Sequence, residues 1–404
     1  MIAYTRKPLR AALMAGCAVG ASFGAAQSAA AQEEIRVGTL YPTSGFCIIF
    51  GEPALQGHQI MVDKINAAGG INGKKIVTVQ RDTKCNPAEA TAAARDMITK
   101  DNVQFLLGGV SSAVGQAVSE VAKQEGVIYI AAVPKTTEMT KPENFHKYMF
   151  RAAANTNTEG KSAAVLADRV GMNKICTILM DYSYGHSLSE AFLDHIKKIR
   201  PQAEVVAQVW PKQGTTDYTA YITELMNAGC DGVFSGVWGS LFVAFAKQAA
   251  SFGLFDQVKY VSAGEIGSPE VAEQLGDDMP SGIWGNSYDV FYYPDTPEHD
   301  AYVEELRKAT GKEHPGSWPI TGYMAMQWLA AGIEKAGSTD TEAVIAALEG
   351  LTIQTPIGAQ TMRASDHQAN RGQVWGEMNP SGDPSYPYKI MNPVEYIPAD
   401  DLMD

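Results

Sequence analysis

Cationic residues are scarce in this chain of 404 residues. Lys and Arg number 32 against 45 Asp and Glu, which gives a formal net charge of −13. An acidic surface repels nucleic acid and anionic membranes, so the composition argues against both as partners. After the first 31 residues, no run reaches the roughly 18 consecutive apolar residues that a membrane-spanning helix needs.

Catalytic and cofactor motifs are also missing. The seven histidines are scattered, and no pair has the helical spacing of a metal site. Neither a Gly-x-Ser-x-Gly elbow nor a phosphate-binding Gly-x-x-x-x-Gly-Lys loop occurs. Asp181 with His186 is the one pair that resembles a catalytic dyad. We therefore expect no enzyme activity, no metal and no cofactor.

The N-terminal residues have the pattern of a secretory signal. Three cations precede the small apolar run from Ala11 to Ala26, and Ala29-Ala30-Ala31 comes before a polar start at Gln32. This pattern predicts a signal peptide over residues 1–31 that is cleaved, and a mature protein outside the cytoplasm, in the periplasm. A retained membrane anchor and a lipoprotein cleavage at Cys17 are the alternatives.

The mature chain has few cysteines, and their number is even: Cys47, Cys85, Cys176 and Cys230. An oxidising compartment favours disulfides, and four cysteines allow three pairings. Cys47 and Cys85 each follow a predicted strand at the same sheet edge, so we favour bonds 47–85 and 176–230. Four separate buried thiols are the alternative, and no pair has metal-ligand spacing.

The first half of the chain alternates strands and amphipathic helices. Residues 35–41 read as a strand, 53–68 as a helix and 76–79 as the next strand, with Asn86-Pro87-Ala88-Glu89 as a helix start. Further strands are predicted at 103–107 and 127–131 and a helix at 112–124. Strands alternating with helices indicate a parallel, doubly wound sheet.

The pattern then restarts and finally fades. Four helices, at 158–170, 184–199, 217–227 and 240–252, alternate with strands at 174–180, 203–209, 232–235 and 258–262. Two long helices, 297–310 and 320–335, are expected to return to the first half. The tail from Thr361 to Asp404, with its prolines and paired tyrosines, is predicted to be loop-rich.

Several short motifs now carry a family resemblance. They are the strand with Pro42-Thr43-Ser44-Gly45, the stretch from Ile65 to Gly73, Asp82 to Ala90, Gly108 to Ser112, Tyr184-Gly185, and Met362 to Gln368. Their order resembles that in periplasmic solute-binding proteins of the leucine/isoleucine/valine-binding type, which serve ABC importers. The resemblance covers essentially the whole mature chain.

The resemblance implies an α/β protein with two Rossmann-like lobes that have parallel central sheets, joined by three crossovers near Ala153, Gly285 and Thr361. Lobe 1 is then 32–153 plus 286–361, and lobe 2 is 154–285 plus 362–404. The ligand lies in the cleft between the lobes, which close on it by hinge motion. Such proteins are usually monomers and work with an inner-membrane ABC permease.

In this fold the strand-to-helix loops face the cleft. The loops are 44–50, 108–113, 133–136, 181–184, 237–240 and 264–266. Ser111 and Ser112 begin a helix, whose free N–H groups favour a carboxylate, as the family's loop does. A plain helix N-cap is the alternative for one of them.

The resemblance assigns the other ligand groups. Glu265 matches an acid that pairs with the ligand ammonium, and Tyr184 matches a tyrosine that lines the cleft. Trp238 replaces another aromatic there. Phe46, Phe50 and Trp318 are further candidates near the mouth. Solvated or purely packing roles are the alternatives for these residues.

Two departures from the family pattern leave the ligand open. Val133-Pro134-Lys135 stands where amino-acid binders place small residues and a Thr, and it adds a cation that can hold a carboxylate. Thr156 stands where an Asp often helps to hold the ammonium. Both changes favour an organic acid, whereas Glu265 favours an amino acid.

The sequence therefore predicts a periplasmic receptor that captures a small carboxylate-bearing solute, with a hydrophobic or branched-chain amino acid as the main hypothesis. The alternatives are an organic, possibly aromatic, carboxylic acid or an amide, and a ligand-sensing module.

Overall fold

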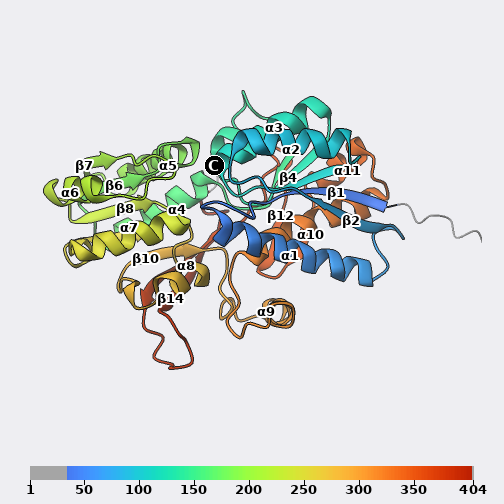
Figure 1. The fold of residues 1–404 in the computed structure, drawn as a ribbon. Coiled ribbons are helices and arrows are strands. Elements are labelled where there is room, and N and C mark those ends of the chain that lie inside the picture. Colours follow the sequence, from blue (N-terminus) through green and yellow to red (C-terminus); the bar gives the residue numbers. More distant parts are fainter. Residues whose placement is uncertain (1–33, 403–404) are drawn as a thin grey trace, which may run out of the picture. The chain divides into compact units, whose positions relative to one another are not determined.

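A five-stranded parallel sheet forms the first half of the chain (Figure 1). We describe a computed structural model that covers residues 34–402, so the predicted signal peptide lies outside the described residues. The strand order is β2-β1-β3-β4-β5. The strands are β1 (Glu34–Leu40), β2 (Lys75–Gln80), β3 (Phe105–Gly108), β4 (Ile128–Ala131) and β5 (Met149–Arg151).

Three helices connect these strands: α1 (Ile48–Ala67), α2 (Pro87–Thr99) and α3 (Ser112–Glu125), and the 3₁₀ turn η1 (Thr137–Met139) follows β4. Helix α2 begins as predicted, since the Asn86 side chain accepts the N–H groups of Ala88 and Glu89. Helix α1 begins five residues before the predicted Pro53, which lies inside it. Proline is frequent in the first turn of a helix but does not always stand there. Here the N-cap residue is Cys47.

The second sheet has seven strands in the order β14-β13-β10-β9-β8-β6-β7. The strands β6 to β10 are parallel, and β13 and β14 are antiparallel to their neighbours, so this sheet is mixed. The strands are β6 (Lys174–Leu179), β7 (Glu204–Val209), β8 (Gly232–Gly236), β9 (Lys259–Ser262), β10 (Trp284–Ser287), β13 (Gln373–Asn379) and β14 (Ile390–Ile397).

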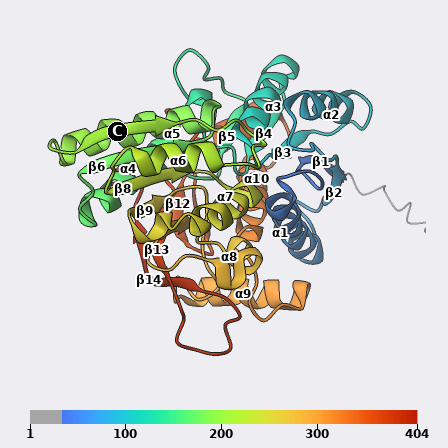
Figure 2. The same ribbon diagram turned by 60° about the vertical axis from the view of Figure 1, so that its left-hand side comes forward.

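Most of residues 362–402 is loop, as predicted, but two strands that the sequence did not predict, β13 and β14, extend the second sheet (Figure 2), where β13 pairs with β10. The composition rule treats proline as a loop residue, but an edge strand such as β14 tolerates one, here Pro393. The helices of this half are α4 (Thr156–Arg169), α5 (Ser183–Ile199), α6 (Thr219–Asn227), α7 (Gly239–Ser251) and α8 (Pro269–Leu275), with the 3₁₀ turns η2 (Leu254–Asp256) and η3 (Gly276–Asp278).

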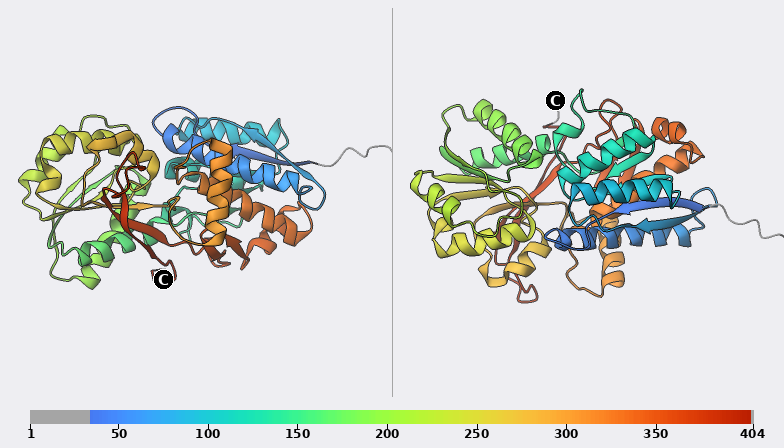
Figure 3. Two further views of the ribbon diagram at one scale, coloured as in Figure 1. Left: turned by 90° about the horizontal axis from the view of Figure 1, so that it is seen from below. Right: turned by 45° about the horizontal axis from the view of Figure 1, so that its top comes forward.

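A segment distant in sequence returns to the first sheet (Figure 3). It contains α9 (Pro297–Thr310), α10 (Pro319–Ala336), α11 (Thr341–Leu348) and the hairpin of β11 (Thr352–Thr355) and β12 (Gly358–Thr361). Helix α10 packs along α1, as expected of the two long helices. We call β1–β5 with α1–α3 and α9–α11 the first lobe, and β6–β10, β13 and β14 with α4–α8 the second lobe. The predicted fold class is confirmed.

Each of the two disulfides links segments that belong to neighbouring strands of one sheet. Cys47, after β1, is bonded to Cys85, after β2, and Cys176 in β6 is bonded to Cys230, just before β8. The first bond holds the loop at the carboxyl end of β1 against its neighbour. Among residues 34–402, every helix is too short or too polar to cross a bilayer.

Glycine allows α1 and α10 to approach closely. A Cβ at Gly322 would lie 1.8 Å from the carbonyl oxygen of Ala54, and a Cβ at Gly57 would lie 1.8 Å from that of Pro319. Backbone oxygens cannot rotate away as side chains do, so the two helices depend on these glycines.

Gly322→Ala should therefore lower the free energy of unfolding by about 1–3 kcal/mol, the usual cost of overpacking. Urea denaturation measures the change, and Gln56→Ala, at an exposed position of α1, is the control. An unchanged midpoint for Gly322→Ala would contradict the close contact.

Candidate functional site

A small cavity of about 20 Å³ lies where strand-to-helix loops of the two sheets meet. The carboxyl ends of parallel strands converge there, as in other open α/β sheets. The cavity is lined by Val110, Ser112, Val133, Lys135, Tyr182, Tyr184, Trp238, Glu265 and Trp318. Seven of these were named from the sequence, while Val110 and Tyr182 fall inside predicted loops but were not singled out.

Ser112 provides a hydroxyl group at the start of α3. Its Oγ accepts the backbone N–H groups of Lys135, at 3.2 Å, and Thr136, at 3.1 Å. These bonds use the oxygen as an acceptor and leave the hydroxyl hydrogen free to donate. Ser111 is the N-cap residue without a side-chain cap bond, and Gln213 Nε2 donates to its Oγ over 3.4 Å. Ser111 itself does not line the cavity.

Lys135 brings its ammonium group between two carboxylates of the second lobe. Lys135 Nζ donates to Glu159 Oε1 at 2.8 Å and also to Glu265 Oε1. The three side chains are 3%, 0% and 5% exposed, so this charged cluster is almost dry. Asn286 Nδ2 donates to both carboxylates, at 2.9 and 3.2 Å. The lysine thus joins the first lobe to the second.

Two carboxylates share one ammonium group in this cluster. Burial raises the pKa of Glu265 to about 7, Lys135 opposes the rise, and Glu159 adds to it. Burial works against the charge of Lys135, but the two glutamates outweigh it and raise the lysine pKa. The ring centre of Tyr288 lies 4.9 Å from Lys135 Nζ and 4.8 Å from the guanidinium carbon of Arg371. Lys135 thus supplies a single positive charge to two carboxylates.

The backbone at Glu265 is held in an unusual conformation. Its φ is +57°, in the left-handed region that non-glycine residues seldom adopt. The Glu265 N–H donates to Asn286 Oδ1 at 2.7 Å. Such outliers persist where the surroundings fix them and cluster at binding sites. The same asparagine thus orients both the backbone and the carboxylate of Glu265.

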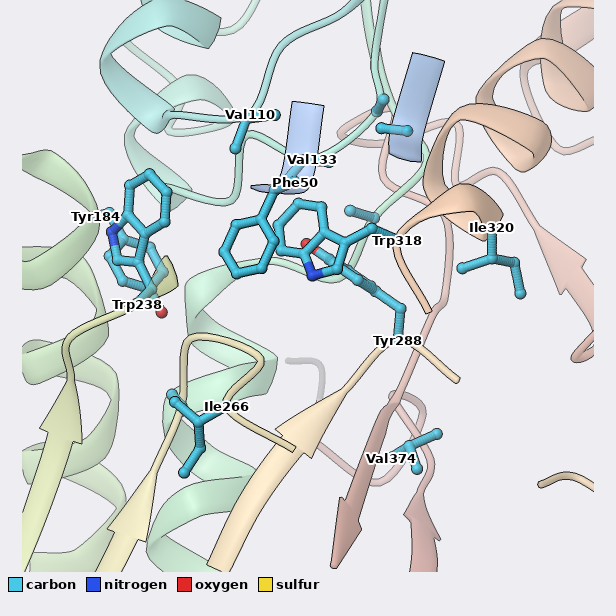
Figure 4. Packing of buried hydrophobic residues seen from close by; sticks show 14 of the residues in the cluster. Phe50, Val110, Val133, Tyr184, Trp238, Ile266, Tyr288, Trp318, Ile320 and Val374 are labelled. Atoms are coloured by element: carbon cyan, nitrogen blue, oxygen red, sulfur yellow. The ribbon is translucent and has the colours of Figure 1, made fainter. Parts of the chain in front are cut away.

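Aromatic rings form the apolar wall of the cavity (Figure 4). Phe50 stacks on Trp318, with ring centres 3.7 Å apart, and lies 6.1 Å from Trp238. Phe46 contacts Trp238 from the first lobe, at 5.7 Å. Trp238 Nε1 donates to Tyr182 Oη at 3.0 Å. Phe46 and Phe50 therefore pack against rings of the wall without bordering the cavity themselves.

Two polar atoms of the wall have no partner among the described residues, namely Tyr184 Oη and Trp318 Nε1. Buried polar atoms are normally hydrogen-bonded, so such atoms at a cavity are available to a ligand or to water.

Thr156 lies behind the cavity rather than on its wall. Its backbone N–H donates to the carbonyl of Lys135 at 2.9 Å, and its hydroxyl lies 2.8 Å from Ser187 Oγ. These contacts fix the loop that carries Lys135. Val133 of the same loop does border the cavity.

Glu159 was missed by the sequence analysis. It lies in the first turn of α4, where an acid is the usual complement to the helix dipole. In the sequence, the only hint was the unusual lysine at position 135, because a lysine buried in the cleft needs an acidic partner. Within residues 34–402 no group of three or more His, Cys, Asp or Glu side chains is placed to hold a metal ion.

Lys135→Met should lower the free energy of unfolding at pH 8 by about 3–5 kcal/mol, because a buried ion loses its partner. In the wild-type protein the pKa of Glu265, raised from 4.5 to about 7, makes stability fall as pH rises through that window, since the folded state holds the extra proton. In Lys135→Met the free energy of unfolding should fall more steeply with rising pH than in the wild type. The stability that the substitution removes should therefore be smaller at pH 5 than at pH 8.

Urea denaturation at the two pH values checks this. Lys141→Met is the control, because Lys141 and its partner Glu138 are 37% and 32% exposed and such pairs contribute under about 1 kcal/mol. Equal losses at both pH values for Lys135→Met would exclude the proposed charge balance.

Curated relatives resemble the chain along most of its length. The leucine-, isoleucine-, valine-, threonine- and alanine-binding protein of Pseudomonas aeruginosa is 28% identical over 338 residues, which cover 83% of this chain and 87% of the relative. The Leu/Ile/Val-binding protein homolog 3 of Brucella melitensis is 28% identical over 356 residues, covering 86% and 92%.

Solved structures share the fold. A solute-binding protein of an ABC transporter from R. palustris, in complex with 4-hydroxybenzoate, has a TM-score of 0.80 at 22% identity, covering 90% of this chain and 97% of that one. The branched-chain amino acid transporter substrate-binding protein LivJ of Streptococcus pneumoniae, in complex with isoleucine, has a TM-score of 0.78 at 20% identity, covering 91% and 100%.

A family model described as periplasmic binding protein matches residues 34–383, which is most of the chain. The motif order, the two α/β lobes and the cavity at the strand ends agree with this match. The chain therefore belongs to the periplasmic binding protein family.

Proposed function

We propose that the protein is the solute-binding component of an ABC importer and that it captures a hydrophobic or branched-chain amino acid. The observation that carries the proposal is the lining of one cavity, which combines an acid, a hydroxyl group at a helix start and aromatic rings. The name of the Pseudomonas aeruginosa relative, a leucine-, isoleucine-, valine-, threonine- and alanine-binding protein, favours the same ligand class.

Glu265 is the group that we assign to the ligand ammonium. Its Oε1 already accepts Lys135 and Asn286, whereas no hydrogen bond among the described residues uses Oε2. Because the residue borders the cavity, Oε2 is available to a charged donor of the ligand. An ammonium group would also balance the second carboxylate of the cluster, which Lys135 alone does not.

Ser112 and the start of α3 are assigned to the ligand carboxylate. The free hydroxyl hydrogen of Ser112 and the unpaired N–H groups of the first helical turn are donors, and the helix dipole favours an anion. Tyr184 Oη and Trp318 Nε1 supply further donors to the cavity. Tyr184, Trp238 and Trp318 would then contact the hydrophobic side chain of the ligand.

Closure of the lobes would bring these groups together. Lys135 bonds to Glu159 and Glu265 across the lobes, and Ser240 Oγ donates to the carbonyl of Phe46 at 2.9 Å. We divide the chain as the sequence suggested, into lobe 1, residues 32–153 plus 286–361, and lobe 2, residues 154–285 plus 362–404, except that β10 assigns residues 286 and 287 to lobe 2. The ligand-bound, closed form is what an inner-membrane permease would recognise. We infer a monomer that is exported by residues 1–31, acts in the periplasm and performs no catalysis.

The second candidate ligand is a carboxylic acid without an amino group. Lys135 favours it, because the lysine already supplies one cation to Glu265. A neutral hydroxyl group of such an acid could then donate the hydrogen bond to Glu265 Oε2, and no ammonium group would be needed.

A thermal-shift screen of the mature protein should identify leucine-like amino acids as stabilising ligands. A ligand at about 100 times its Kd stabilises the folded state by about 2.7 kcal/mol, which is a shift of several degrees. Aromatic and aliphatic acids, amides and polar amino acids complete the panel. Shifts with acids that lack the amine, and none with amino acids, would overturn the main proposal in favour of the second ligand class.

Glu265→Gln should weaken the binding of an amino acid by about 30-fold or more, because the ligand ammonium loses a buried charged partner worth 2 kcal/mol or more. The matching 2-hydroxy acid should be affected much less. Isothermal titration calorimetry measures both, and Asp181→Asn is the control, since Asp181 is exposed and does not border the cavity. Equal effects on both ligands would argue against the ammonium contact.

A further inference from the structure

Helix α8 of the second lobe holds the loop that leads into α10 of the first lobe. Glu270, five residues after Glu265, accepts two backbone N–H groups of this loop. Ser317 N donates to Oε2 at 3.1 Å and Trp318 N donates to Oε1 at 2.9 Å. A single carboxylate thus fixes the main chain at Trp318, a residue that borders the cavity.

Gly316 makes this approach possible. A Cβ at position 316 would lie 2.1 Å from Glu270 Oε1 and 2.5 Å from its carboxyl carbon. Any side chain there would push the carboxylate away from the two N–H groups. The glycine and the glutamate therefore work as one clamp on residues 316–318, which we call the Trp318 clamp.

The clamp determines where the indole ring lies. The Trp318 ring stacks on Phe50, at 3.7 Å, and meets Tyr288 edge-on, at 5.1 Å (Figure 4). The Trp318 carbonyl accepts the hydroxyl of Thr321 at 2.8 Å. Neighbouring rings thus hold the Trp318 side chain, and Glu270 holds its main chain. This part of the cavity wall can therefore move little.

This arrangement is costly for the folded protein. Part of the Glu270 side chain remains accessible, but loss of solvent around its carboxylate raises the pKa to about 7, against the two backbone hydrogen bonds that lower it. An ionised Glu270 carboxylate that has lost solvent contributes little to the stability of the fold. The surface pair of Glu273 and Lys312, 3.5 Å apart, joins the same helix and loop without that cost.

We propose that Glu270 is a positioning residue that sets the size of ligand the cavity accepts, by fixing Trp318 from the opposite lobe. The inference rests on the proposed function, since it concerns the same cavity. Glu270 follows Glu265 on one short segment, so the segment that carries the polar contact also places the apolar wall. Ligand charge and ligand size are then recognised together when the lobes close.

The first test needs no ligand. The chain has six tryptophans, so a proton–nitrogen NMR spectrum of ¹⁵N-indole-labelled protein should show six indole signals, and Trp318→Phe assigns that of Trp318. In Glu270→Gln the Trp318 signal should broaden or double, because an amide offers one acceptor for two N–H groups. Glu273→Gln, which removes a charge from the same helix, should leave it unchanged.

The second test measures Kd for alanine, valine, leucine and phenylalanine by calorimetry. Glu270→Gln should weaken leucine about tenfold, as expected for one lost hydrogen bond, and change alanine little. The ratio of the Kd for phenylalanine to that for leucine should fall at least about threefold. In a Trp318→Ala background, adding Glu270→Gln should change none of the affinities, because the glutamate acts through the indole.

An equal loss for all four ligands, or an undiminished effect in the Trp318→Ala background, would overturn the inference, as would an unchanged Trp318 signal. If the wild-type protein binds none of the four, the proposed ligand class fails, and the NMR result then decides separately whether Glu270 positions Trp318.

Discussion

The ammonium group of Lys135 lies between Glu159 and Glu265, and the architecture of the site depends on this contact. Lysine belongs to the first lobe and both acids to the second, so the contact forms only when the lobes meet. In a nearly dry environment each carboxylate needs a partner, and one lysine cannot fully balance two. In the proposed function, a ligand group that donates hydrogen bonds would supply the partner that Lys135 alone does not.

The rest of the site is arranged around this contact by backbone geometry. The parallel strands of both sheets end at the cavity, and their loops carry Ser112, Lys135 and Glu265. The aromatic wall comes from both lobes, because Trp318 lies in the first and Trp238 in the second. A ligand seated there touches polar groups from two sheets and rings from both lobes, which is why closure and recognition are one event in this proposal.

Local patterns predicted the elements well and their long-range pairing poorly. The helix at α9 was predicted with its observed bounds, and α2 begins at the predicted cap, because caps, glycines and apolar spacing act over a few residues. The strand β14 was missed because pairing with β13 overrides a composition typical of loops. The role of Glu159 was missed because an acid in a first helical turn has a sufficient local explanation.

The sequence alone indicated the family, the two-lobe fold and seven of the residues that line the cavity, since all of these follow from motif order and from strand ends. Tertiary structure decided what those residues do. It turned Lys135 from a free cation into the partner of two acids, and it joined Glu270 to Trp318 across the lobes. The reason is physical: burial and distance set charge balance, and neither can be read from spacing along the chain.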